Sequence, residues 1–312
     1  MNEHKDNQMS RKGFLTKTSA GLLGYGLFRG DRSGLFNSQT ARKQTFPEYR
    51  LLGRTGIKVT PIGFGASRTM EPILVKSALD AGINFIDTGR SYFNGQNEVM
   101  VGKVIRGMRK EVIIQSKIKL NLRGIGEDLD SIAASDRITS LMRSLLAESL
   151  KALQTDYIDV LLVHQANSVD IINHDAVMEF FHNTKEKGQI RACGFSSHSN
   201  QVELLIAANK SKSYDVVMVP YNHKGSYTHS NTGKYSEWDQ PALEKELVKA
   251  ESNNIGIVAM KTCSAGPYAF KGEGQPSYRA ALKWILNHSY IATMAVAMGN
   301  LSELSEDLQA MI

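Results

Sequence analysis

The sequence predicts an α/β protein in which eight parallel strands close into a (β/α)8 TIM barrel. Short, apolar, β-branched runs alternate eight times with segments of helical periodicity. The runs are apolar on both faces, as expected for parallel strands that helices cover. A doubly wound open sheet would alternate in the same way, but no G-x-G-x-x-G loop occurs in the chain. A closed barrel is therefore the favoured fold.

The composition is that of a globular chain with one basic segment. Of 312 residues, 42% are hydrophobic and 22% are charged, which is enough for a sizeable core. The formal net charge is +6. Residues 1–43 contain eight Lys or Arg and three Asp or Glu, so they carry +5 and the remainder only +1. Because the excess charge belongs to this segment, we expect no nucleic-acid partner.

Residues 1–46 are expected to be a signal-like or disordered tail and linker, and residues 47–312 the barrel. The segment S-R-K-G-F-L-T-K resembles a twin-arginine export signal in which Lys12 replaces the second arginine. A disordered basic tail is the alternative, so the protein is expected either in the cytoplasm or exported to the periplasm. The apolar run that follows, residues 20–28, is too short to span a bilayer, and no integral membrane segment is expected.

The barrel elements follow in order. Residues 49–53 and 57–60, joined by R-T-G, predict an N-terminal β-hairpin. The eight strands are expected at residues 61–66, 83–87, 111–117, 157–164, 190–196, 214–220, 255–260 and 291–297. The helices are expected at residues 71–81, 97–107, 135–153, 174–187, 200–208, 241–253, 277–287 and 302–311. Gly82 and Gly188 suit helix ends, Pro241 suits a first turn, and residues 222–240 are expected to be a long polar loop.

Four polar residues with complementary chemistry stand at or after the ends of three consecutive strands. Asp87 and Tyr92 follow the second strand, Lys117 the third and His164 the fourth. Because barrel active sites lie at the C-terminal strand ends, these side chains are expected to converge. Each one alone has a structural explanation, such as a turn cap, a packed tyrosine, a solvated lysine or a core histidine. Together they suit proton donation to a carbonyl oxygen, since an ammonium lowers the pKa of a phenol.

Several segments from Leu51 onward resemble the aldo-keto reductase family. The resemblance is carried by L-G-R-T-G-I-K-V-T-P-I-G-F-G, G-I-N-F-I-D-T-G-R-S-Y with N-G-Q-N-E, S-L-K-A-L-Q-T-D-Y-I-D-V-L-L-V-H and K-G-Q-I-R-A-C-G-F-S-S-H. It implies an NAD(P)H-dependent oxidoreductase that reduces a small-molecule aldehyde or ketone to an alcohol by hydride transfer. Tyr92 would be the proton donor, Lys117 its pKa partner, Asp87 the partner of Lys117, and His164 the residue that orients the carbonyl. The alternative is a cofactor-binding regulatory or sensor barrel with little turnover.

The resemblance also assigns residues to the nicotinamide and phosphate groups of the cofactor. Ser196 and Ser197 stand where the family contacts the nicotinamide amide, and Ser197 takes the place of a common Asn. Met218 replaces a usual Gln in the sixth strand, so one amide hydrogen bond is lost. Met260 and Lys261 resemble the branch that reads A-M-K-P, and Lys261 is expected to approach a cofactor phosphate.

Gly299 and Asn300 precede the last helix, whose N-terminus suits a phosphate. The basic residue that commonly holds the 2′-phosphate of NADP is not evident there. NADP is nevertheless the expected cofactor and NAD the alternative, a preference that comes from the family alone. Some relatives with an export-like leader continue into an iron-sulfur domain, but Cys193 and Cys263 are the only cysteines, so no metal site is expected. Nothing in the sequence indicates the oligomeric state.

Overall fold

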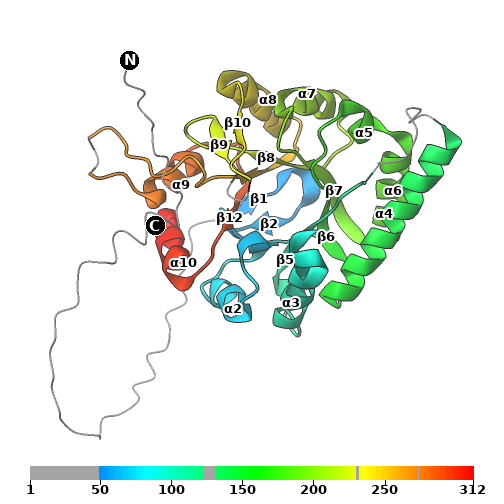
Figure 1. The fold of residues 1–312 in the computed structure, drawn as a ribbon, viewed down its shortest axis with the longest axis horizontal. Helices are drawn as coiled ribbons and strands as arrows, with labels where there is room; N and C mark the ends of the chain where they lie inside the picture. The colour runs from blue at the N-terminus through cyan, green and yellow to red at the C-terminus, as the bar shows by residue number, and fades with distance from the viewer. Residues whose placement is uncertain (1–48, 122–130, 230–231, 273) are drawn as a thin grey trace, which may run out of the picture.

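The computed structural model describes residues 49–121, 131–229, 232–272 and 274–312. The expected tail and linker, with the export-like motif, lie outside this part of the chain. The (β/α)8 barrel is confirmed: eight parallel strands close in the order β3-β4-β5-β6-β7-β8-β11-β12, and β12 pairs with β3. Figure 1 shows the helices arranged around these strands.

The strand and helix bounds agree with the predicted order of elements. The barrel strands are β3 (Ile62–Gly65), β4 (Phe85–Asp87), β5 (Ile113–Ile118), β6 (Ile158–Val163), β7 (Ile190–Ser196), β8 (Val216–Pro220), β11 (Gly256–Met260) and β12 (Thr293–Ala297). The helices are α2 (Pro72–Asp80), α3 (Gln96–Val104), α4 (Ile132–Leu153), α5 (Val169–Asn173), α6 (Asp175–Glu186), α7 (Gln201–Ser211), α8 (Gln240–Ser252), α9 (Tyr278–Leu286) and α10 (Leu301–Leu308). Single 3-10 turns cover Gly53–Thr55, Ala66–Arg68, Tyr92–Gly95, Arg109–Glu111 and Gln309–Met311.

Two apolar cores hold the barrel together. One lies between the strands and the surrounding helices, and the other fills the barrel itself. The interior core includes Phe85, Val160 and Val258, which alternate with residues that face the helices. Each strand therefore buries both of its faces, which explains why the sequence shows continuous apolar runs instead of a polar–apolar alternation.

The predicted N-terminal hairpin is confirmed and packs on the interior core. β1 (Arg50–Leu51) pairs antiparallel with β2 (Lys58–Val59), and Leu52, Ile57 and Val59 are buried against the barrel interior. Because the backbone amide of Arg54 donates to the carbonyl of Asn254, just before β11, the hairpin lies at the N-terminal end of the barrel. This placement leaves the opposite end, where the strands finish, for a functional site.

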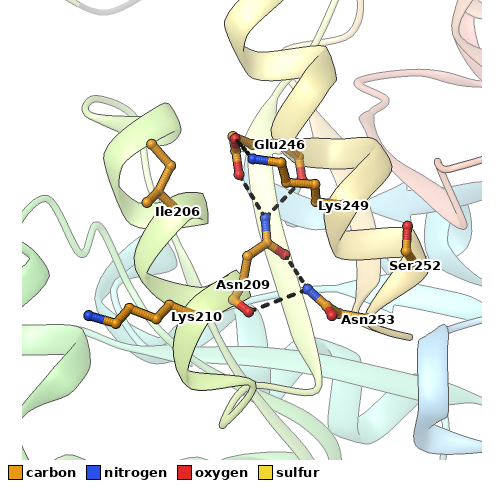
Figure 2. Close-up of a pocket in the computed structure, with 7 residues that line it drawn as sticks. All are labelled: Ile206, Asn209, Lys210, Glu246, Lys249, Ser252 and Asn253. Carbon is orange, nitrogen blue, oxygen red and sulfur yellow. Dashed lines mark hydrogen bonds and ion pairs between the residues drawn. The ribbon is translucent and has the colours of Figure 1, made fainter.

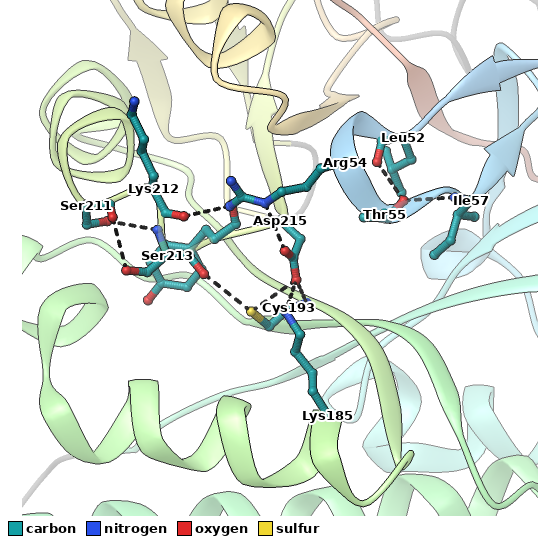
Figure 3. A network of polar contacts seen from close by, with 11 residues as sticks. Leu52, Arg54, Thr55, Ile57, Lys185, Cys193, Ser211, Lys212, Ser213 and Asp215 are labelled. Carbon is teal, nitrogen blue, oxygen red and sulfur yellow. Dashed lines mark hydrogen bonds and ion pairs between the residues drawn. The ribbon is translucent and has the colours of Figure 1, made fainter.

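An ion-pair network fastens the hairpin to the N-terminal end of the barrel (Figure 3). The Asp215 carboxylate, just before β8, accepts from Arg54 Nε at 3.2 Å and from Lys185 Nζ at 2.7 Å. The same carboxylate accepts from the backbone amide of Cys193 at 3.0 Å. One buried anion thus joins the hairpin, the end of α6 and two barrel strands.

The structure differs from the prediction in two loops and in several helix ends: α3 ends at Val104 instead of residue 107, and α7 ends at Ser211 instead of residue 208. The expected polar loop at residues 222–240 contains a second hairpin, in which β9 (Ser226–Thr228) pairs antiparallel with β10 (Tyr235–Glu237). Helix α5, after β6, was not expected. Helix α4 begins at Ile132 instead of residue 135, because the Ser131 side chain caps it by accepting from the Ala134 amide at 3.2 Å.

The helix layer also contains a polar groove between α7 and α8 (Figure 2). Asn209 Nδ2 donates to the Glu246 carboxylate at 3.1 Å, and Asn253 Nδ2 donates to Asn209 Oδ1 at 3.1 Å. The groove is thus a satisfied contact between two helices. In the described residues, no helix is long and apolar enough to cross a membrane, and no cluster of three or more His, Cys, Asp or Glu side chains could hold a metal ion.

Candidate active site

Three of the predicted residues meet at the ends of β4 and β5. The ammonium of Lys117 lies 2.6 Å from Asp87 Oδ1 and 3.1 Å from the phenol oxygen of Tyr92. It also donates to the backbone carbonyl of Thr88 at 2.6 Å. Lys117 and Asp87 are almost completely buried, with exposed fractions of 1% and 2%. The three side chains therefore form one acid–base group, in which Lys117 and Asp87 are buried and Tyr92 is half-buried.

A second ion pair beneath the loop holds Tyr92 in this position. Glu98, at the start of α3, accepts from Ser116 Oγ and from Arg90 Nη1, each at 2.6 Å. These bonds tie the loop that carries Arg90 and Tyr92 to strand β5. Glycine suits position 95, because L side chains rarely adopt its φ of 84° and a Cβ atom there would displace the Arg90 guanidinium. The N-G-Q-N-E segment thus has a structural role in placing the phenol.

His164 completes the predicted group, immediately after β6. Its ring lies edge-on to the ring of Tyr92, with 5.8 Å between ring centroids. Its Nδ1 atom lies 3.1 Å from the hydroxyl of Ser91, a residue that sequence analysis did not single out. All four residues predicted to act together are thus brought together, and Ser91 joins them.

Burial and charge determine the protonation of the lysine and the phenol. Burial by itself lowers the pKa of Lys117, but the Asp87 carboxylate and Tyr92 outweigh it, and the pKa is raised. Burial raises the pKa of Tyr92, and Asp87 adds to this, whereas Lys117 acts in the opposite direction. Lys117 does lower the pKa of Tyr92, as predicted, but the effect of burial is larger. Tyr92 is accordingly a neutral phenol that can donate a proton.

His164 is neutral in this site. Burial, followed by the positive charge of Lys117, lowers its pKa to about 2. The ring therefore carries one N–H at neutral pH, as donor or acceptor toward Ser91 according to tautomer. If Ser91 donates to Nδ1, the proton of the ring lies on Nε2.

Gln115 is a buried polar residue that sequence analysis missed. Its Nε2 atom donates to Asp87 Oδ1 at 2.6 Å and approaches the sulfur of Met218 at 3.4 Å. Its Oε1 atom is buried and has no hydrogen-bond partner among the described residues. The signal was available in the sequence, because Gln115 is the one amide in the apolar strand I-I-Q-S-K. The predicted loss of an amide at Met218 is thus accompanied by another amide that reaches the same place from β5.

The two predicted serines lie at the end of β7, and their hydroxyls already have partners. Ser196 Oγ accepts from the backbone amide of Gln165 at 3.3 Å. Ser197 Oγ lies 3.3 Å from Asn167 Oδ1 and donates to the backbone carbonyl of Ser199. Both residues are fully buried. They lie beside Met218, since Ser196 pairs with Met218 across β7 and β8.

Met260 ends β11, and Lys261 follows it in a left-handed conformation with φ of 58°. The ammonium of Lys261 lies 5.1 Å from the centroid of the Tyr227 ring, which hairpin strand β9 supplies. His198 faces the same ring at 6.4 Å between centroids, and its Nδ1 atom has no partner in the described part of the chain. Burial lowers the pKa of Lys261. Burial, followed by the charge of Lys261, lowers that of His198 to about 3.

Gly299 and Asn300 lie at the start of α10, where they were predicted. Asn300 caps the helix, because its Oδ1 atom accepts from the Glu303 amide at 2.9 Å. The Gly299 amide donates to Glu303 Oε2 at 2.8 Å. Glu303 was not singled out from the sequence. Its carboxylate accepts from the Gly299 amide, at the helix end where a cofactor phosphate was expected.

The chain resembles one protein family over most of the barrel. Residues 66–277 match the model of the Aldo/keto reductase family. The aldo-keto reductase YhdN of Bacillus subtilis is 33% identical over 190 residues, which cover 56% of this chain and 54% of that protein. L-galactose dehydrogenase of Arabidopsis thaliana is 25% identical over 297 residues, which cover 84% of this chain and 88% of that protein.

Solved structures show the same fold. The holo form of an aldo-keto reductase from Bacillus halodurans superposes with a TM-score of 0.64 at 22% identity, covering 84% of this chain and 90% of that one. An aldo-keto reductase from Klebsiella pneumoniae in complex with NADPH gives a TM-score of 0.60 at 20% identity, covering 85% and 90%.

Proposed function

Because the chain belongs to the aldo/keto reductase family, we propose that it reduces an aldehyde or ketone to an alcohol with a nicotinamide cofactor. The observation that carries this proposal is the contact of Tyr92, Lys117 and Asp87, with His164 beside them. A neutral phenol and a neutral imidazole at the C-terminal strand ends suit a carbonyl oxygen that gains negative charge.

The nicotinamide end of the site fits such a cofactor. The carboxamide of nicotinamide brings both N–H donors and a carbonyl acceptor. Gln115 Oε1 is a buried acceptor without a partner in the described residues, and it lies beside Met218 and the end of β7. An amide group entering from the barrel mouth would satisfy it, as buried polar atoms require. Gln115, Ser196 and Ser197 would therefore hold the carboxamide, and Lys261 a phosphate.

When bound, a reduced nicotinamide would supply the hydride for the carbonyl carbon. With Ser91 donating to Nδ1, His164 would donate its Nε2–H to the carbonyl oxygen and so orient the substrate. Tyr92 transfers its phenolic proton to that oxygen as negative charge develops on it. Lys117 stabilises the phenolate that remains, because its ammonium lies 3.1 Å from the oxygen. Asp87 keeps Lys117 charged and fixed in place.

Tyr92→Phe tests this assignment, since it removes the proton donor and little else. We expect the rate of carbonyl reduction to fall by about 10²- to 10⁴-fold, while the dissociation constant of the cofactor stays within twofold. Purified protein would be titrated with NADH and NADPH and then assayed on a panel of aldehydes, ketones and sugar aldehydes. The sugars are included because one relative is named for L-galactose.

The panel also separates the enzyme from the regulatory or sensor barrel. A protein that binds the cofactor but reduces no carbonyl compound would support the regulatory function and contradict the enzymatic one. A Tyr92→Phe variant as active as the wild type would contradict the role of the phenol. Export through residues 1–46 stays a prediction, because this segment lies outside the described residues.

A further inference from the structure

The start of α10 contains a buried acidic side chain that folds back onto the helix end. Glu303 is only 2% exposed, and its Oε2 atom accepts from the Gly299 amide at 2.8 Å. The Glu303 amide is itself taken by the Asn300 side chain at 2.9 Å. Two backbone donors that could face a bound phosphate are therefore already used by the chain.

The charge around this helix end does not favour a dianion. Residues 299–312 contain Glu303, Glu306 and Asp307 but no Lys or Arg. In the described part of the chain, Arg68 is a cation beside Glu303, with its Nη1 atom 3.9 Å from Glu303 Oε2. The charge of Arg68 is offset by the Glu303 carboxylate, so this pair offers a phosphate group no net positive charge. A carboxylate instead suits a hydroxyl, because it has two oxygens that accept several hydrogen bonds.

If the carboxamide lies near β7 as proposed, the order of the strands brings the start of α10 toward the adenosine half of a dinucleotide. Strands β7, β8, β11 and β12 are consecutive around the barrel. Ser196 and Ser197, which are proposed to hold the carboxamide, lie at the end of β7, and Met218 lies in β8. Lys261 follows β11, and α10 begins after β12. A dinucleotide with its nicotinamide near β7 and its phosphates near Lys261 would bring its adenosine ribose to α10.

We infer that Glu303 makes this site select NAD(H) over NADP(H), by accepting a hydrogen bond from the 2′-hydroxyl of the adenosine ribose and repelling a 2′-phosphate. The same use of a carboxylate occurs at the ribose of NAD in other folds. The inference rests on the proposed function, since it requires a nicotinamide dinucleotide in the mouth of the barrel. It reverses the preference for NADP that the family resemblance alone suggested.

The test compares NADH with NADPH, and ADP-ribose with 2′-phospho-ADP-ribose, by calorimetric titration of the purified protein. We expect the wild type to bind the two molecules without a 2′-phosphate at least tenfold more tightly. Glu303→Gln keeps an acceptor for the Gly299 amide but removes the charge. It should improve the affinity for the two 2′-phosphorylated molecules about tenfold or more, since one charge no longer opposes a nearby dianion.

Glu306→Gln is the matched control, because it removes the same charge from the same helix at a half-buried position, while the Gly299 amide keeps its bond to Glu303. It should leave the ratio of the two affinities within twofold of the wild type. NADPH that binds the wild type as tightly as NADH would overturn the inference alone, as would an unchanged ratio in a folded Glu303→Gln protein. Binding of neither cofactor would overturn the proposed function together with the inference.

Discussion

At the scale of single residues, Gln115 places an amide beside Met218, where the sequence suggested that an amide was missing. Met218 stands where the family has an amide, and from the sequence this looked like a weaker nicotinamide site. In the folded chain, the Gln115 amide lies 3.4 Å from the Met218 sulfur and 2.6 Å from Asp87. Gln115 on β5 thus supplies an amide inside the barrel, next to Met218 on β8.

The contact between Gln115 and Met218 predicts that a second substitution restores the cofactor affinity lost by a first. Gln115→Met should weaken NADH or NADPH binding by about five- to tenfold, the effect of one hydrogen bond of roughly 1–1.5 kcal/mol. Adding Met218→Gln should restore most of the affinity, because it returns an amide to the same place. Calorimetric titration measures both effects. ADP-ribose is the control ligand, since it lacks the nicotinamide; an equal loss of its affinity would show that Gln115 supports the fold instead of contacting the carboxamide.

The raised pKa of Tyr92 predicts how the rate of carbonyl reduction depends on pH. Because burial raises the pKa of Tyr92, the phenol stays protonated throughout the neutral range. Carbonyl reduction at saturating cofactor should therefore be level near neutral pH and fall only in the alkaline range. Steady-state rates across that range would measure this. A loss of rate that begins below pH 8 would contradict a phenol with a raised pKa.

At the scale of the elements, Asp215 holds the N-terminal hairpin, α6 and β8 to one another. Its pKa is lowered: burial raises it, but Lys185, the Cys193 amide and Arg54 outweigh burial. Asp215→Asn should lower the free energy of unfolding by about 2 kcal/mol, because it leaves two cations without their shared anion. Denaturant titration measures this.

The matched control for Asp215 is an exposed carboxylate with one partner. Asp80 pairs with Lys76 one helical turn away, and its side chain is 59% exposed. Asp80→Asn should change the free energy of unfolding by no more than about 0.5 kcal/mol. Neither substitution should change the rate of carbonyl reduction, since Asp215 lies at the end of the barrel opposite Tyr92. A large loss of activity in folded Asp215→Asn protein would contradict this separation.

The second hairpin was the element that sequence patterning did not show. Its strands have three residues each, and of the six only Ser226 and Tyr227 are buried, so no alternation marks them. Tyr227 is nevertheless the residue that packs against His198 and Lys261. A loop between two barrel strands thus contributes a wall of the mouth through one aromatic side chain, which only long-range packing reveals.

For the molecule as a whole, the buried histidines predict acid sensitivity. His164 has a folded-state pKa of about 2, and His198 one of about 3, against roughly 6.5 in an unfolded chain. The unfolded state therefore binds more protons below pH 6.5. The stability that the neutral rings contribute is fully present above that pH and is lost as the pH falls. Each ring can contribute up to about 1.4 kcal/mol per pH unit to this slope.

His164→Gln should reduce the slope of unfolding free energy against pH between pH 7 and pH 5. The reduction should be at most that of one bound proton, about 1.4 kcal/mol per pH unit. Denaturant titrations at several pH values would measure the slope. His182 is the control, because its side chain is 70% exposed on the surface of α6. His182→Gln should leave the slope nearly unchanged, and an equal effect of the two substitutions would contradict a special role for the buried ring.

The sequence by itself determined the barrel, the order of its elements and the group formed by Asp87, Tyr92, Lys117 and His164. Local periodicity marks each strand and helix, and parallel closure brings the strand ends together whatever the details of packing. Only the tertiary structure decided the rest. Gln115 meets Met218 from 103 positions away, and Ser91 meets His164 from 73 positions away. Such contacts depend on barrel closure and side-chain direction, which no short-range pattern encodes.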